Sequence, residues 1–295
     1  MAETTPLFDE EFLRKLEYLN IVSKHLVPGH MHGEHRARKV GTGLEFADYR
    51  AYVPGEDVRN VDWRTYLRLD RLILRLFEEE ADLPIYVFFD SSRSMDHGEP
   101  PKFDYARKVA AALTYIGLLN LDRVNLIAFA GGIAGEMSSR RGKSQVWHAF
   151  RFLESLSASG TTAMELAFRS FFSTKRRRGL VVVVSDFLDE NGFGRAFDLL
   201  RYFRQDVFAI QVLGLDEGRP DLPDEVQVMD IEDRGTQRLR VTPGLLDAYE
   251  RKFREHSEDI QRYCMKYGWG FIQTTTEVPF EDLILQIFRQ GRFLG

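Results

Sequence analysis

The chain has 295 residues, of which 44% are hydrophobic and 29% are charged, as in an ordinary globular protein with ample core. The formal net charge of −5 argues against a dedicated nucleic-acid-binding protein, and the single cysteine, Cys264, excludes an internal disulfide framework. No apolar run approaches the roughly 20 residues that span a bilayer. Residues 1–20 are acidic and amphipathic, unlike a signal peptide, so we expect a cytoplasmic protein.

The first predicted element is an amphipathic helix over residues 9–26, where Phe12, Leu16 and Leu19 recur at helical spacing. Pro28 and Gly29 end it. Three histidines follow in a basic, glycine-containing loop that lacks cysteines and a pattern of partnering carboxylates. We therefore predict no zinc site at these residues: His30, His32 and His35.

Acidic, basic and aromatic residues alternate densely over residues 41–63, around a Pro54-Gly55 turn. Arg50 and Arg59 stand near several acidic residues, so we expect internal Arg–carboxylate pairs. Two interpretations stay open at this point. The pairs hold an irregular loop against Trp63, which we expect to support the subdomain, or the stretch forms a structured docking surface.

Strands and helices alternate through the rest of the chain, which predicts a doubly wound, mainly parallel α/β sheet. Apolar runs buried on both faces predict the central strands, and an inward-facing stripe predicts each helix. The predicted strands are 72–80, 85–89, 123–130, 179–184, 207–213, 226–231, 238–241 and 270–274. The predicted helices are 103–119, 144–156, 163–173, 195–204, 243–267 and 279–289.

Small oxygen-bearing side chains follow the ends of the central strands. Asp90, Ser92 and Ser94 alternate after the strand 85–89, and Asp186 comes just after the four-valine strand. In a doubly wound sheet these strand ends lie on one edge, where ligands bind. Converging carboxylate and hydroxyl oxygens suit a hard cation such as Mg²⁺. The alternative is that Asp90 and the serines only cap the first turn of a helix.

These residues resemble the metal-ion-dependent adhesion site of the von Willebrand factor A fold, which has Asp-x-Ser-x-Ser, then a threonine in a glycine-containing loop, then an aspartate after a later strand. Thr162 matches better than Thr161 because it stands five residues before Ala167, and Arg93 replaces the usual glycine. The resemblance implies Mg²⁺, with Mn²⁺ or Ca²⁺ as possible substitutes, and an open position for a partner's acidic side chain. The implied metal ligands are Asp90, Ser92, Ser94, Thr162 and Asp186.

A second resemblance extends over about residues 28–290. The motifs Gly43-x-Glu45-Phe46, Arg50-x-Tyr52-x-Pro54-Gly55-Glu56-Asp57-x-Arg59 and Asp62-Trp63 are similar to those of the bacterial family called domain of unknown function fifty-eight, although Glu56 replaces the usual aspartate. The family implies a von Willebrand factor A-like domain and a MoxR-type AAA+ ATPase as partner. We accordingly divide the chain into an N-terminal helix (1–27), a small family-signature subdomain (28–82) and the A-like domain (83–295).

The predicted function is a non-enzymatic, Mg²⁺-dependent interaction module without catalytic residues. By resemblance it acts with the MoxR-type ATPase in chaperone-like assembly or maturation of a client protein. One alternative is a metal-free scaffold in which Arg93 supplies the positive charge. The other is a Mg²⁺-dependent hydrolase with Asp90 as nucleophile, although the chain has no Walker A sequence and no Gly-x-Ser-x-Gly elbow.

Overall fold

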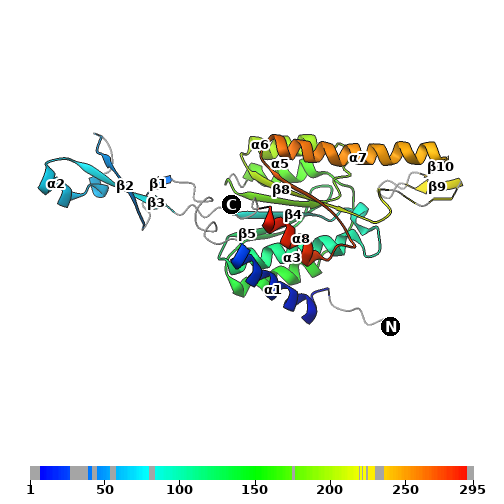
Figure 1. Cartoon of the computed structure of the whole chain (residues 1–295), viewed down its shortest axis with the longest axis horizontal. Coiled ribbons are helices and arrows are strands. Elements are labelled where there is room, and N and C mark those ends of the chain that lie inside the picture. The colour runs from blue at the N-terminus through cyan, green and yellow to red at the C-terminus, as the bar shows by residue number, and fades with distance from the viewer. Residues whose placement is uncertain are drawn as a thin grey trace. The chain divides into compact units, whose positions relative to one another are not determined.

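The computed structural model describes residues 7–26, 39–41, 45–53, 58–79, 84–174, 177–218, 220, 222–223, 225–229 and 236–290. The chain forms two compact units, which are described separately: Met1–Pro28 with Pro84–Leu294, and Gly29–Leu83. Figure 1 labels most of the helices and strands of both. The histidine loop of residues 30–35 lies outside the described residues, as does the Pro54-Gly55 turn.

The larger unit is built around a six-stranded sheet with the order β11-β8-β7-β4-β5-β6. Five strands run parallel, and β6 pairs with β5 antiparallel at one edge. This arrangement confirms the predicted doubly wound, mainly parallel α/β sheet. The strands are β4 (Ile85–Asp90), β5 (Val124–Phe129), β6 (Ile133–Arg140), β7 (Leu180–Ser185), β8 (Asp206–Leu213) and β11 (Gly270–Thr275).

The strand order reverses between β4 and β7. Numbered along the chain, the six strands lie in the order 3-2-1-4-5-6, so the first and fourth are neighbours. Open α/β sheets bind ligands at such a reversal, outside the carboxyl ends of the strands. Phe89 of β4 pairs with Val184 of β7, which sets Asp90 and Ser185 side by side at that end of the sheet.

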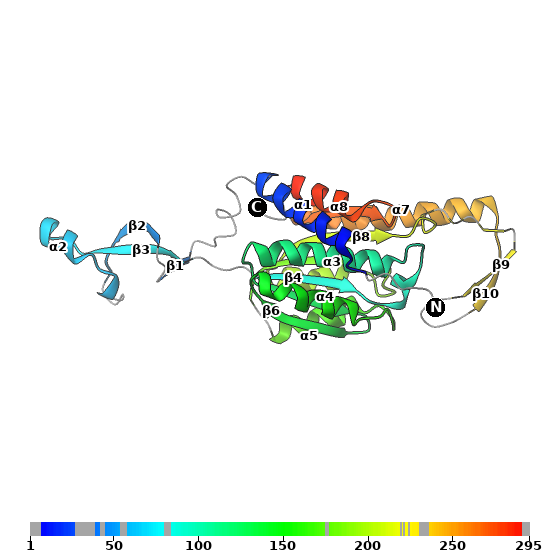
Figure 2. The same cartoon turned by 90° about the horizontal axis from the view of Figure 1, so that it is seen from below.

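Helices cover both faces of this sheet. Figures 1 and 2 show α1, α3, α4 and α8 on one face and α5, α6 and α7 on the other. The first group is α1 (Glu10–Leu26), α3 (Lys102–Leu119), α4 (Val146–Glu154) and α8 (Phe280–Arg289). The second is α5 (Met164–Thr174), α6 (Gly194–Tyr202) and α7 (Pro243–Lys266). A short hairpin of β9 (Glu225–Met229) and β10 (Thr236–Arg240) precedes α7.

The core is aromatic on the α5 side of the sheet. Phe88 of β4 is fully buried, and its ring centroid lies 4.9 Å from Phe168, 5.1 Å from Phe171 and 5.9 Å from Phe172, all on α5. Every residue of β4, β5 and β7 is buried, which explains why these strands appear in the sequence as continuous apolar runs. They form a rigid base for the loops at their carboxyl ends.

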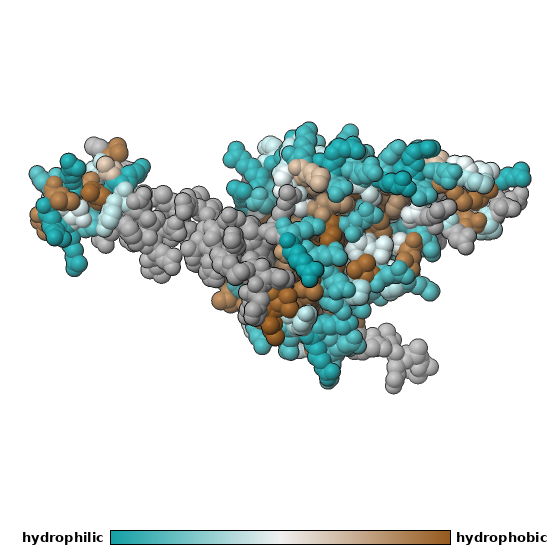
Figure 3. Space-filling model, viewed as in Figure 1, coloured by the Kyte–Doolittle hydropathy of each residue, from teal (hydrophilic) through white to brown (hydrophobic). Residues whose placement is uncertain are grey.

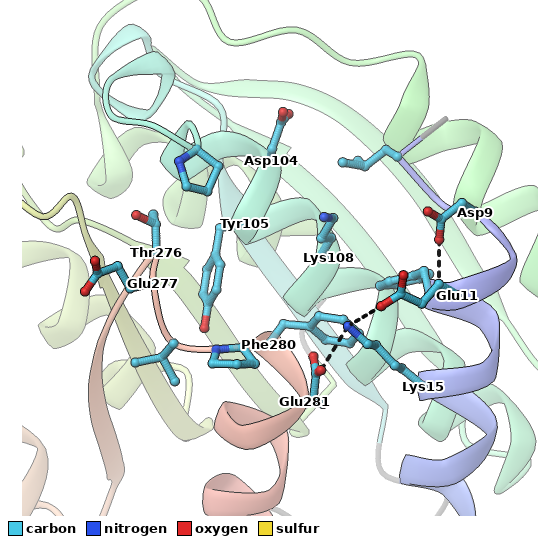
Figure 4. Close-up of a pocket in the computed structure, with 15 residues that line it drawn as sticks. Asp9, Glu11, Lys15, Asp104, Tyr105, Lys108, Thr276, Glu277, Phe280 and Glu281 are labelled. Atoms are coloured by element: carbon cyan, nitrogen blue, oxygen red, sulfur yellow. Dashed lines mark hydrogen bonds and ion pairs between the residues drawn. The ribbon is translucent and has the colours of Figure 1, made fainter. Parts of the chain in front are cut away.

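The predicted N-terminal helix packs on the larger unit. Phe12 of α1 lies 4.9 Å from Phe280 of α8 and 6.1 Å from Phe150 of α4, measured between ring centroids. Lys15 bonds Glu11 and Glu281, each at 3.0 Å, as the dashed lines in Figure 4 show. Between α1, α3 and the start of α8 lies a cavity of about 380 Å³, which contains none of the predicted metal ligands.

The smaller unit holds an antiparallel sheet with the order β1-β3-β2 and one helix, so the small β-rich part of the predicted fold class is present. Its elements are β1 (Lys39–Gly41), β2 (Glu45–Ala51), α2 (Trp63–Leu69) and β3 (Ile73–Glu79). Asp62 begins α2, because its Oδ1 accepts hydrogen bonds from the backbone nitrogens of Arg64 and Thr65 at 3.0 and 3.2 Å.

The expectation that Trp63 is a buried support was wrong. Trp63 is 53% exposed, and its ring makes an edge contact with Tyr66 on the same helix. No residue of α2 is buried. Figure 3 shows hydrophobic residues at the surface of this unit, at the left of the view. The exposed large apolar side chains of this unit include Tyr49, Val53, Val58, Leu67 and Leu69. Such a surface favours the docking-surface interpretation of this stretch.

Several strands and one helix of the structure were not predicted from the sequence. The edge strand β6 was not predicted because only Met137 of its residues is buried, so its sequence lacks the alternating apolar pattern of a half-buried strand. The strands β1 and β2 and the helix α2 were not predicted either, because the sequence between the N-terminal helix and residue 72 was treated as irregular. The remaining predicted strands and helices occur, with ends shifted by a few residues.

Phe12→Ala should destabilise the larger unit by roughly 3–5 kcal/mol, because it removes a buried ring that joins α1 to α4 and α8. Urea unfolding followed by circular dichroism measures this change. Tyr18→Ala, on the exposed side of the same helix, is the control and should cost about 0.5 kcal/mol or less. Equal effects of the two substitutions would mean that α1 is not packed as described.

Trp63→Ala should cost the smaller unit only about 1 kcal/mol or less, because half of the ring already faces solvent. Leu74→Ala, at a buried position of β3 in the same unit, should cost roughly 2–4 kcal/mol. Thermal unfolding of both variants gives the comparison. A loss for Trp63→Ala as large as that for Leu74→Ala would restore Trp63 as a structural residue.

Candidate metal-ion site

Asp90 is fixed at the end of β4 by donors from two elements. Its Oδ2 accepts a hydrogen bond from the Ser185 hydroxyl of β7 at 2.6 Å, and its Oδ1 accepts one from the backbone nitrogen of Ser92 at 2.9 Å. Asp90 is fully buried. The carboxylate is therefore held in one orientation at the reversal of strand order.

The two predicted serine ligands come together in the loop after β4. The hydroxyl oxygens of Ser92 and Ser94 lie 3.0 Å apart, with Ser92 just before the short 3-10 helix η2 (Arg93–Asp96) and Ser94 within it. Ser92 stands at the N-cap position of η2, yet its side chain makes no capping hydrogen bond, and α3 begins later, at Lys102. Ser92 therefore does not cap a helix, whereas the Asp90 carboxylate does accept a backbone hydrogen bond in this turn, as the capping alternative expects.

Hydrogen bonds join the loop that carries Thr162 to the loop after β4. The backbone nitrogen of Arg93 donates to the carbonyl of Gly160 at 3.0 Å, and that of Ser159 donates to the carbonyl of Ser91 at 2.8 Å. Thr162 is itself buried. The loop that carries Thr162 is thus held against the Asp-x-Ser-x-Ser segment.

Asp186 follows β7 and is also fully buried. Its Oδ1 accepts a hydrogen bond from the backbone nitrogen of Leu188 at 3.0 Å, and its Oδ2 accepts one from the ammonium of Lys102 at 2.7 Å. Burial, together with the negative charge of Asp186, raises the pKa of Asp90 to about 7, although hydrogen bonds from Ser185 and Ser92 oppose the rise. The two carboxylates therefore lie close enough to repel each other.

Two charged residues at this edge were not predicted. Lys102, on the first turn of α3, has a fully buried side chain and pairs with both Asp186 and Glu217. Burial alone would lower the pKa of Lys102, but the charges of Asp186 and Glu217 outweigh it, and the pKa lies above its ordinary value. Lys102 is therefore an ammonium at neutral pH.

A signal for Lys102 was present in the sequence. Lys102 stands four residues before Ala106 and seven before Val109, so it lies on the inward stripe of the helix that follows the loop after β4. Glu217 gave a weaker signal, because it follows the strand β8 at the same edge but shares that position with Asp216. The pairing of the two could not be read from sequence order alone.

The donor set fits a hard divalent cation. It offers two buried carboxylates and a pair of adjacent hydroxyls, and the raised pKa of Asp90 marks an excess of negative charge that a cation would relieve. Within the described part of the chain, no three His, Cys, Asp or Glu residues form a cluster suited to a metal. A metal here would therefore need the hydroxyls and water to complete its shell.

The sequence of this chain matches the model of the family described as "Protein of unknown function DUF58" over residues 48–259, and the chain belongs to that family. The match confirms the resemblance noted in the sequence, over a shorter range than 28–290. An uncharacterized protein of Mycobacterium tuberculosis is 28% identical over 276 residues, which cover 91% of this chain and 86% of the relative. An uncharacterized protein of Mycobacterium bovis matches equally.

Solved structures with some similarity include the conserved hypothetical protein BatB from Bacteroides thetaiotaomicron, at 16% identity and a TM-score of 0.40. The alignment covers 71% of this chain and 99% of BatB. An aerotolerance-related membrane protein from Bacteroides fragilis is 18% identical with a TM-score of 0.41, over 70% of this chain and 99% of that protein. Among the helices described for the present chain, none has the length and apolar character needed to cross a membrane.

Asp90→Asn should stabilise the metal-free protein at about pH 8 by roughly 1–4 kcal/mol. The folded-state pKa of Asp90 is raised to about 7, so ionising this group as the pH rises from about 4 to 7 costs folding free energy. The amide has no proton to lose and avoids that cost, and the advantage should shrink toward pH 4. Unfolding in EDTA across this pH range measures it.

The control for this measurement is Asp96→Asn, an exposed aspartate in the same loop, which should change stability by about 0.5 kcal/mol or less at either pH. A metal-free Asp90→Asn protein that is less stable than the wild type at about pH 8 would show that the two carboxylates do not repel each other in the fold.

Proposed function

We propose that the larger unit is a non-enzymatic interaction module that binds a partner protein through a divalent cation. Mg²⁺ is the proposed ion, with Mn²⁺ or Ca²⁺ as substitutes, and Asp90, Ser92, Ser94, Thr162 and Asp186 are its proposed ligands. The observation that carries the proposal is the meeting of a hydroxyl pair and two mutually repelling carboxylates at the reversal between β4 and β7.

Each of the chain's own residues has a distinct part in this proposal. Ser185 and the backbone nitrogen of Ser92 hold the Asp90 carboxylate in place, so it contributes charge without swinging toward solvent. The hydroxyls of Ser92 and Ser94 offer neutral oxygens, which leaves the positive charge of the ion only partly balanced. When bound, the ion would supply a position that accepts the carboxylate of an acidic side chain from a partner.

The burial of Asp90 argues against the hydrolase alternative. A carboxylate nucleophile must reach the substrate, yet both oxygens of Asp90 already accept hydrogen bonds and the residue is fully buried. The scaffold alternative assigns the compensating positive charge to Arg93. The structure adds a second source of positive charge, because Lys102 pairs with Asp186.

For the partner, we propose a MoxR-type AAA+ ATPase and a client protein that offers an acidic residue, in chaperone-like assembly or maturation within the cytoplasm. The support for this part is the family to which the chain belongs. The test is co-purification of the chain with a MoxR-type AAA+ ATPase of its host, with Mg²⁺ and with EDTA. Capture that depends on Mg²⁺ and is lost with Asp90→Ala supports the proposal, whereas equal capture under all conditions contradicts it.

Asp90→Ala and Asp186→Ala should each abolish Mg²⁺ binding, because each removes one of the two carboxylates that attract the ion. Isothermal titration calorimetry of the EDTA-treated proteins measures the affinity, and circular dichroism verifies that each variant is folded. Asp96→Ala removes an equal charge from an exposed position of the same loop and should bind Mg²⁺ as the wild type does. Wild-type affinity in both site variants would place the ion elsewhere.

A further inference from the structure

We infer that Lys102 is a resident cation of this site that shares Asp186 with the divalent ion and thereby weakens binding of that ion. The inference deepens the proposed function and rests on it. Lys102 is a positioning residue in this account, because it acts on the ion through Asp186.

The burial of Lys102 requires an explanation. A lysine ammonium is strongly hydrated, and removing it from water is costly unless carboxylates pair with it. Lys102 is fully buried, and its Nζ lies 2.7 Å from Oδ2 of Asp186 and also contacts Glu217. The two carboxylates make the buried charge tolerable, so the three residues form one electrostatic unit.

Glu217 holds Lys102 in place from the other side. Its carboxylate accepts a hydrogen bond from the backbone nitrogen of Gly214 at 2.8 Å, and its backbone carbonyl accepts one from the Tyr249 hydroxyl of α7 at 2.7 Å. The loop after β8 is therefore anchored both to its own strand end and to α7. Lys102 thus joins this loop to the end of β7 through its contacts with Glu217 and Asp186.

Both oxygens of Asp186 are already engaged, one by Lys102 and the other by the backbone nitrogen of Leu188. An ion that uses Asp186 must share an oxygen with the ammonium. The positive charge of Lys102 also repels a second cation, because charges this close interact strongly in a site with little water. Within this group of contacts two carboxylates, Asp186 and Glu217, pair with one ammonium, which leaves one negative charge for a bound cation to balance.

The test compares Mg²⁺ binding by calorimetry among charge variants of the full chain. Lys102→Met removes the ammonium and keeps much of its volume, and Lys102→Gln keeps a hydrogen-bond donor without the charge. Both should bind Mg²⁺ about tenfold or more tightly than the wild type. Lys108→Met loses the same charge from a partly exposed position of α3 and should change the affinity by about twofold or less.

Two further measurements keep the inference testable if a Lys102 variant folds poorly. Added Mg²⁺ should raise the melting temperature of the Lys102 variants more than that of the wild type, since tighter binding gives larger stabilisation. Glu217→Gln retains the Lys102–Asp186 pair but leaves the ammonium with one carboxylate, so it should bind Mg²⁺ less tightly than the wild type. Tighter binding by Glu217→Gln would overturn the inference.

The outcomes separate the inference from the proposed function. If the wild type binds Mg²⁺ and the Lys102 variants bind it equally or less tightly, the role of Lys102 is overturned and the proposed function stands. If only the Lys102 variants bind Mg²⁺, the inference is supported and the wild type is not a Mg²⁺-dependent module. If no protein binds Mg²⁺ at millimolar concentration, both are overturned.

Discussion

The close approach of two buried carboxylates, Asp90 and Asp186, is the constraint on which the rest of the site depends. Neighbouring negative charges in a dry environment repel each other, and each also loses its hydration. The protein responds with a donor on every carboxylate oxygen: Ser185 and the backbone of Ser92 for Asp90, and Lys102 and the backbone of Leu188 for Asp186. Two acids at this position cost folding free energy even with these donors, and that cost is the physical basis of the proposed cation site.

The sheet makes this arrangement possible because its central strands are fixed on both faces. β4 and β7 are buried along their whole length and paired in parallel register, so the positions that follow them are set by backbone hydrogen bonds. The reversal of strand order places these two strands side by side, and the connections after them leave in opposite directions. The loops after the strands then carry the chemistry, while the aromatic core against α5 keeps their starting points rigid.

The sequence predicted the parts of this structure that depend on repeating patterns. Continuous apolar runs such as Val181–Val184 identify strands buried on both faces, and the polar residues directly after them identify the edge where a ligand binds. The exposure of Trp63 could not be predicted, because an aromatic residue among charges has no periodic pattern that separates a core position from a surface position. The strand β6 was missed for a related reason, since it lies at the edge of the sheet and is mostly exposed. Lys102 and Glu217 are distant in the chain, and only the packing of α3 beside the loop after β8 joins them.

The protonation state of Asp90 distinguishes a metal-dependent module from a metal-free scaffold. Without a divalent ion, the single ammonium of Lys102 pairs with Asp186 and Glu217, and Asp90 has only neutral donors. Burial first, and the nearby charge of Asp186 second, raise the pKa of Asp90 to about 7, so a metal-free site holds Asp90 partly protonated at neutral pH. A bound divalent ion would favour the ionised form and release that proton, as metal binding to a protonated ligand does. Proton release on addition of Mg²⁺ near pH 7 is therefore a property of the module and not of the scaffold, and it depends on the same two carboxylates that the strand reversal brings together.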